Sequence, residues 1–138
     1  IKTVKKGLTP NETEKKAIEI ITQGLVDLSI LNGELNELIE KGAYRDFYMH
    51  RVGHWMGMDV HDVGSYGLNG KWRKYAPGMI TTIEPGIYFK ENLKNVPKEY
   101  LNIGIRIEDD VLVTEGDPEV LTSSVPKTII EIEKVMGS

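Results

Sequence analysis

The sequence predicts a single α+β domain in which helices come first and strands follow. Apolar residues recur at helical spacing only in the first third of the chain, up to about residue 42. From residue 43 onward that period disappears, glycine becomes frequent, and β-branched runs alternate with turn residues. The chain has 138 residues, which is the length of one domain, and no repeat or linker divides it.

The helical part opens with a strong start signal. Thr9 can cap the first free amides, Pro10 suits the first helical position, and Glu12 completes a capping box. One apolar stripe follows at helical spacing, made of Ile18, Ile21, Leu25, Leu28 and Leu31. The pair Asn32-Gly33 predicts the end of this helix, and residues 35–42 predict a shorter second helix.

The remaining elements are mostly strands. A β-branched run at 79–83 predicts a strand that ends at Pro85-Gly86, and residues 86–89 start a second one. A polar loop follows, and residues 103–113 then form the longest predicted strand. Residues 127–136 predict a closing helix.

The predicted strand at 103–113 alternates in character. Its isoleucines point to one face, which we expect to lie in the core, whereas Arg106 and Glu108 point to the other face. The expected core residues are Ile103, Ile105 and Ile107.

Composition excludes several functional classes. The formal net charge is −4 and no basic stripe is present, so we expect no nucleic-acid partner. No apolar run approaches the roughly 20 residues that a membrane helix needs, and no signal-peptide pattern opens the chain, so we expect no membrane partner. The absence of cysteine excludes disulfides and thiolate metal sites and fits a cytoplasmic location.

All three histidines fall within residues 50–61. His50 and His54 have the spacing of a zincin helix, but Arg51 stands where that motif has glutamate, and nearby glycines oppose a helix. An extended segment also keeps the two rings on one side. His61 is followed by Asp62, whose carboxylate could orient the ring. A single histidine is more often a hydrogen-bonded structural residue, but three among glycines favour a site.

Two glutamates and one arginine complete the candidate site. Glu84 ends a strand before Pro85, and Glu108 stands in an apolar strand. A turn at the surface or a solvated sheet face would explain each carboxylate without any function. A bound metal would instead compensate both charges if they are buried. Arg106, on the face of Glu108, is either its ion-pair partner or a substrate clamp.

Three ordered motifs carry a resemblance to a known family. They occupy residues 49–64, 77–88 and 104–110, and together they resemble the pita-bread metallopeptidases, bacterial aminopeptidase P (Xaa-Pro aminopeptidase) in particular. The short gap between the glutamate motifs resembles aminopeptidase P more than prolidase. The implied fold is the second half of a pita-bread fold: a curved, mostly antiparallel sheet with helices on its outer face.

The resemblance implies a metal centre. It makes His54, Glu84 and Glu108 metal ligands, with Glu108 bridging two divalent ions, and manganese is the expected metal. The implied reaction is hydrolysis, by a metal-activated water, of the bond between an N-terminal residue and a following proline. The implied partner is therefore a peptide with proline in the second position.

The resemblance also implies roles for residues around the metals. His50 and His61 would contact the substrate and the developing oxyanion. Glu84 would shuttle a proton, and Arg106 would orient the substrate or support the site.

The family's two aspartate ligands have no counterpart here, because they come from strands that precede the helical region. Residues 1–138 therefore resemble the C-terminal portion of a catalytic domain, and we expect the isolated chain to be inactive. The parent is expected to be a homo-oligomer, a dimer or tetramer. Two alternatives stay open: a prolidase restricted to dipeptides, and a non-catalytic pita-bread binding module.

Overall fold

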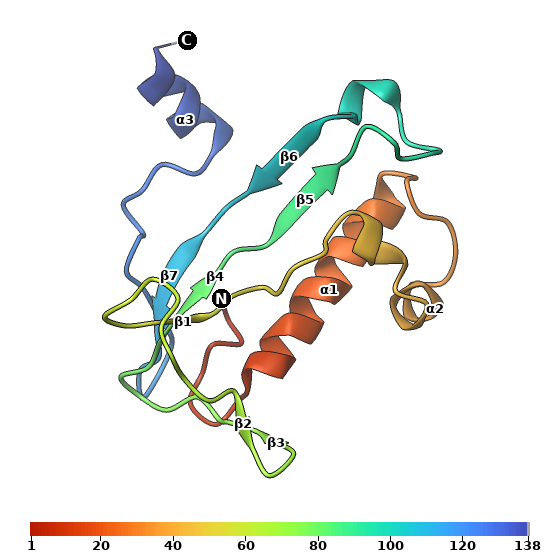
Figure 1. Ribbon diagram of the computed structural model, residues 1–138. Coiled ribbons are helices and arrows are strands. Elements are labelled where there is room, and N and C mark those ends of the chain that lie inside the picture. The colour runs from red at the N-terminus through yellow and green to blue at the C-terminus, as the bar shows by residue number, and fades with distance from the viewer. Residues whose placement is uncertain (138) are drawn as a thin grey trace.

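Two pairs of antiparallel strands, residues 80–83 with 109–112 and residues 86–89 with 103–106, follow one another and form a ribbon through the molecule (Figure 1). The structure, a computed structural model, describes residues 1–137. The strands are β1 (Trp55–Met56), β2 (Gly67–Leu68), β3 (Lys71–Trp72), β4 (Ile80–Ile83), β5 (Gly86–Phe89), β6 (Ile103–Arg106), β7 (Asp109–Leu112) and β8 (Glu119–Val120). The helices are α1 (Pro10–Asp27), α2 (Leu35–Glu40) and α3 (Ile129–Met136), with single 3₁₀ turns at Ala43–Asp46 and Lys98–Tyr100.

Strand pairing in the ribbon is interrupted at one point, where two residues on each chain segment fall outside the strands. β4 pairs with β7 and β5 pairs with β6, so residues 84–85 on one side lie opposite residues 107–108 on the other. Pro85 has no amide for the ladder, although its carbonyl still accepts from the Ile107 amide at 3.3 Å. The prediction of one continuous strand at 103–113 is therefore wrong, and both candidate glutamates lie at the break.

The ribbon belongs to two sheets that differ in burial. β4 and β7 form the middle of a four-stranded sheet in the order β1-β4-β7-β8, whereas β5 and β6 form a two-stranded sheet of their own. A core cluster lies under the four-stranded sheet, formed by Val4, Val52, Trp55, Tyr75, Ile83, Val111 and Val113. A second cluster joins α1 to the 3₁₀ turn after α2, formed by Ile21, Leu25, Ile30, Phe47 and Tyr48.

The outer face of β6 contradicts one prediction. Ile103 and Ile105 of β6, and Ile107 just beyond it, are exposed rather than in the core, with Ile105 62% exposed. With Phe89 of β5 and Leu28 they line an apolar surface groove. The alternation was identified correctly, but Ile21 of α1 and Leu28, which border the groove, leave the three isoleucines exposed.

Helix α1 follows the predicted start but ends early. The capping box of Thr9 and Glu12 is present. The helix stops at Asp27 because Ser29 adopts a left-handed conformation (φ 58°), and the amide of Ile30 then bonds back to the Leu25 carbonyl at 2.9 Å. Leu28 and Leu31 therefore follow the helix instead of belonging to it.

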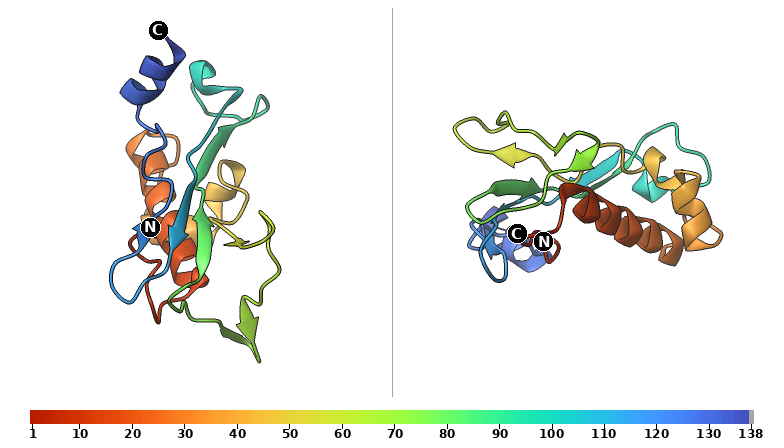
Figure 2. Two further views of the ribbon diagram at one scale, coloured as in Figure 1. Left: turned by 90° about the vertical axis from the view of Figure 1, so that its left-hand side faces the viewer. Right: turned by 90° about the horizontal axis from the view of Figure 1, so that it is seen from below.

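The helices differ in how they meet the sheets. Seen from below, α1 runs along one face of the ribbon, as the resemblance implied for the outer face (Figure 2). The predicted closing helix is present as α3, but it stands apart from the sheets and contains no buried residue (Figure 1). No helix in residues 1–137 combines the length and apolar character needed to cross a membrane.

Candidate metal centre and surrounding pocket

Three predicted ligands come together from three separate segments. His54 precedes β1, Glu84 follows β4, and Glu108 lies between β6 and β7. Each offers one ligand atom, and these atoms all lie within 4.8 Å of one another. The two breaks in the ribbon bring this about, because they place one glutamate on each side at the same level.

The loop that carries His54 lies flat against β4. A side chain at Gly53 would collide with the carbonyl oxygen of Thr82, so glycine is required for this approach. The Thr82 hydroxyl accepts from the His54 amide at 3.0 Å and donates to Glu84 Oε1 at 3.1 Å. Thr82, which is fully buried, therefore fixes His54 and Glu84 relative to each other.

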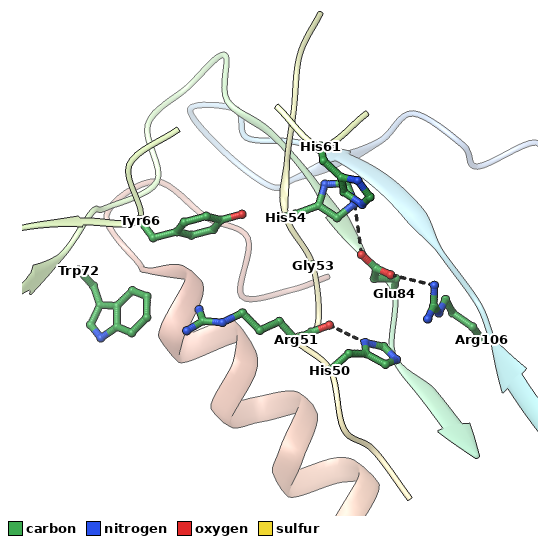
Figure 3. A pocket seen from close by; sticks show the side chains of 9 residues that line it. All are labelled: His50, Arg51, Gly53, His54, His61, Tyr66, Trp72, Glu84 and Arg106. Atoms are coloured by element: carbon green, nitrogen blue, oxygen red, sulfur yellow. Dashed lines mark hydrogen bonds and ion pairs between the residues drawn. The ribbon is translucent and has the colours of Figure 1, made fainter. Parts of the chain in front are cut away.

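The ring of His54 is oriented for coordination. Its Nδ1 lies 3.0 Å from the Trp55 carbonyl oxygen, which can only accept, so Nδ1 carries the proton. Nε2 then faces Glu84 Oε1 at 3.4 Å (Figure 3). The hydrogen bond from Nδ1 to the Trp55 carbonyl is typical of histidines that bind metals.

The two carboxylates differ in their surroundings. Glu84 is only 8% exposed, and Arg106 Nη1 lies 3.4 Å from its second oxygen. Glu108 is exposed to solvent. Imidazole nitrogen and carboxylate oxygen are a donor set that suits divalent metal ions such as manganese or zinc. The described residues therefore fit one part of a metal centre.

A hydrogen-bonded chain links the other predicted residues. Arg106 Nε donates to the Tyr88 hydroxyl at 2.8 Å, and that hydroxyl lies 3.0 Å from His50 Nε2. His50 Nδ1 donates to the Arg51 carbonyl at 2.8 Å, so the hydroxyl of Tyr88 donates to Nε2. The hydrogen bond with Tyr88 also raises the pKa of Arg106. The ring of His50 is thus held at both nitrogens.

Sequence reasoning gave no role to Tyr88. The signal that could have found it is strand periodicity, because Tyr88 pairs with Gly104, two residues from Arg106 on the neighbouring strand. A Cβ at Gly104 would lie 2.9 Å from the Tyr88 ring, so glycine makes room for it.

His61 lies next to His54, with ring centroids 4.2 Å apart. Its neighbour Asp62 accepts from the Val63 amide at 2.8 Å, so that carboxylate is engaged with the backbone of its own loop. The ring of His61 is exposed and free to meet a ligand in the pocket.

A pocket of about 460 Å³ gathers these side chains (Figure 3). Glu108 lies outside its lining, which otherwise contains every predicted site residue. The lining consists of His50, Arg51, Gly53, His54, His61, Tyr66, Trp72, Glu84 and Arg106.

Comparison with known proteins identifies the family. The profile of metallopeptidase family M24 matches residues 1–115, which is most of the chain. The chain belongs to metallopeptidase family M24. This M24 chain is 53% identical to the Xaa-Pro aminopeptidase of Haemophilus influenzae over 134 residues, and 47% identical to that of Escherichia coli over 130 residues. Each alignment covers 94% of this chain, but only 31% and 29% of the relatives.

Solved structures of the family have the same fold. Aminopeptidase PepP of Pseudomonas aeruginosa superposes with a TM-score of 0.93 at 51% identity, covering 98% of this M24 chain and 30% of that protein. E. coli aminopeptidase P bound to the inhibitor Pro-Leu superposes with a TM-score of 0.88 at 46% identity, covering 96% and 30%. A zinc-substituted form of the E. coli enzyme also matches. The predicted pita-bread relationship is confirmed, and the chain spans about three tenths of these proteins.

Proposed function

We propose that the full-length protein containing this chain is an Xaa-Pro aminopeptidase, which hydrolyses the bond between an N-terminal residue and a following proline. The observation that carries the proposal is the convergence of His54, Glu84 and Glu108 to within 4.8 Å in an M24 chain. The Xaa-Pro aminopeptidases among its relatives support the substrate class.

We further propose that residues 1–138 form the C-terminal portion of the catalytic domain. Hard divalent ions prefer six or more ligands, mostly oxygen, whereas this chain brings together one imidazole and two carboxylates. Two manganese ions would need further carboxylates from the upstream part of the parent. The isolated chain is therefore expected to be inactive.

The bound ions would supply Lewis acidity and an activated water. Glu84, fixed by Thr82, is the proposed ligand and proton shuttle, because a carboxylate held beside the reacting atoms can take a proton and return it. Arg106 holds the second oxygen of Glu84 in place. His61 would donate a hydrogen bond to the developing oxyanion.

His50 is proposed to contact the substrate while its proton stays on Nδ1. Its ring lies edge-on to both Tyr48 and Tyr88, with centroids 5.1 and 5.5 Å away, so its orientation is fixed before any ligand arrives. A ring fixed in this way adds to affinity without paying an ordering cost on binding.

The test uses the full-length protein with added manganese and a tripeptide that has proline in its second position. We expect release of the N-terminal residue, measured by mass spectrometry. An intact tripeptide would overturn the proposal. Cleavage of an Xaa-Pro dipeptide alone would identify a prolidase, and binding without cleavage of either peptide would identify a non-catalytic module.

The isolated chain provides a second test. We expect calorimetric titration with manganese to show weak binding or none, because the ligand set is partial. Two tight sites per chain would contradict the proposal that upstream carboxylates are required. A homo-oligomeric parent and a cytoplasmic location remain predictions, and size-exclusion chromatography of the full-length protein tests the first.

A further inference from the structure

The pocket has a cationic side opposite its acidic side. The guanidinium of Arg51 points away from Glu84 and toward two aromatic side chains (Figure 3). It lies 5.4 Å from the ring centroid of Trp72 and 6.0 Å from that of Tyr66. Contacts of this kind are attractive and favour a guanidinium held over the aromatic faces.

Arg51 carries a charge that the described chain does not neutralise. Within residues 1–137 it forms no ion pair, whereas Arg106 across the pocket is paired with Glu84. The backbone carbonyl of Arg51 is engaged with His50, but that contact leaves the guanidinium free. Its donors form a planar fork that matches a carboxylate or phosphate.

The aromatic partners are held by a tight hairpin. β2 and β3 are joined by Asn69 and Gly70, both with positive φ (53° and 75°), which is the signature of a type I′ turn. The amide of Arg73 donates to the Tyr66 carbonyl at 2.8 Å and extends the pairing by one step. The hairpin therefore fixes the backbone positions of Tyr66 and Trp72, and the Tyr66 ring also stacks on Trp55 with centroids 5.4 Å apart.

The same hairpin adds positive charge beside the pocket. Lys71 lies at its tip next to Trp72, and Arg73 and Lys74 follow directly. A local excess of one sign of charge attracts an oppositely charged ligand. These basic side chains favour an anion beside Arg51, although the net charge of the whole chain is negative. The carboxylate of Glu14, which lies by the same loop, is engaged with the Val52 amide at 2.7 Å.

We propose that Arg51, held between Trp72 and Tyr66, binds the C-terminal carboxylate of short peptide substrates and so selects for their length. This inference rests on the proposed function. The reacting end of the peptide would lie at His54 and Glu84, and an extended residue spans roughly 3.3–3.6 Å. The guanidinium of Arg51 lies across the pocket from Glu84 (Figure 3), so it would face the carboxylate end of a di- or tripeptide.

The test compares a tripeptide with proline in its second position as the free acid and as the C-terminal amide. In the full-length protein we expect kcat/KM to favour the acid by about tenfold, mostly through KM, as for one charge-assisted hydrogen-bonded pair. Arg51→Gln should bring the ratio of acid to amide close to one. Arg51→Lys should give an intermediate ratio, because it keeps the charge and loses the fork.

Arg73→Gln is the matched control. It removes a charge from the same hairpin, but its guanidinium lies over Trp55 and does not line the pocket. We expect this variant to keep the wild-type ratio. An equal ratio in wild type and Arg51→Gln, or an equal loss in Arg73→Gln, would overturn the role of Arg51.

A binding measurement separates this inference from the proposed function. Calorimetry with a prolyl dipeptide and with its amide measures the preference without catalysis. If the tripeptides stay intact but Arg51→Gln still weakens binding of the acid about tenfold, the subsite stands and the aminopeptidase proposal fails. If the dipeptide and its amide bind wild type equally, the subsite is wrong, whatever the catalytic result.

Discussion

The four-stranded sheet and the β5–β6 hairpin are built from the same ribbon, but they differ in how they are stabilised. In the sheet, Val111 of β7 and Thr82 of β4 are fully buried. In the hairpin, Ile105 is 62% exposed, although its strand alternates just as regularly. One ribbon therefore has a complete core at one end and an uncovered apolar face at the other.

The candidate site lies at the boundary between these two regions. Glu84 belongs to the buried side, where Thr82 and Arg106 hold its carboxylate. Glu108 belongs to the junction with the hairpin and is exposed. The comparison teaches that order at the site comes from the four-stranded sheet, while the hairpin contributes through Tyr88 and Arg106.

The largest expected effect is on catalysis from the buried side. Glu84→Gln in the full-length protein should lower kcat/KM by roughly 10³-fold or more, because it removes the proposed proton-transfer group and metal ligand. Steady-state kinetics on the tripeptide measures the loss. Glu91→Gln, on an exposed loop, is the control and should stay within about twofold. A loss of only a few-fold in Glu84→Gln would show that the reaction does not need this carboxylate.

The second prediction compares the stability of the four-stranded sheet with that of the β5–β6 hairpin. Trp55→Ala removes a ring that packs against Tyr66 and Tyr75 in the core and should lower the free energy of unfolding by about 3–5 kcal/mol. Ile105→Ala on the hairpin should cost less than about 0.5 kcal/mol in the 138-residue chain. Urea denaturation of the two variants gives the difference. Similar losses would mean that the hairpin face is as well packed as the sheet.

The sequence predicted most of the buried side. The capping box at Thr9, the strand before Glu84 and the convergence of Glu84 with His54 follow from local patterns and ordered motifs. These features depend on residues close in sequence or on a resemblance that covers most of the chain. That is why they could be predicted without coordinates.

The hairpin side could not be predicted as well. Strand alternation shows that Ile105 and Arg106 face opposite ways, but it does not show which face is covered. The break at 107–108 is set by Pro85 on the opposite strand, which only the pairing register reveals. The β2–β3 hairpin, in contrast, could have been predicted, because Asn69-Gly70 is typical of a type I′ turn. The prediction for this region rested only on its frequent glycines.

A smaller effect is expected where the hairpin supports the site. Tyr88→Phe keeps the ring against Gly104 but removes the hydroxyl between Arg106 and His50. Loss of an orienting hydrogen bond at a metal site typically costs 10–100-fold, and we expect such a decrease in kcat with KM within about threefold. Nitrogen chemical shifts of His50 should also change, because Nε2 loses its donor.

Tyr100→Phe is the control for Tyr88→Phe. It removes a hydroxyl from the same region of the hairpin, where its ring packs on Phe89 at 5.5 Å, outside the pocket. We expect no change in kcat. Equal effects in the two variants would assign the loss to hairpin packing and not to the hydrogen-bonded chain.

The smallest effect concerns α3, which is stabilised by neither core. Its first turn is held by a capping box in which the Thr128 amide donates to Glu131 at 2.9 Å, and this bond lowers the pKa of Glu131 from its usual 4.5 to about 2. A depressed folded-state pKa means that the contribution is fully present above pH 4.5 and is lost as the pH falls toward 2. The helical chemical shifts of residues 129–136 should therefore weaken over that window. Glu131→Gln should remove this pH dependence, because an amide does not titrate.

Since no residue of α3 is buried, the rest of the chain should keep its shifts while α3 frays. If the four-stranded sheet lost its shifts over the same window, α3 would be coupled to that sheet, and the separation between them would be wrong.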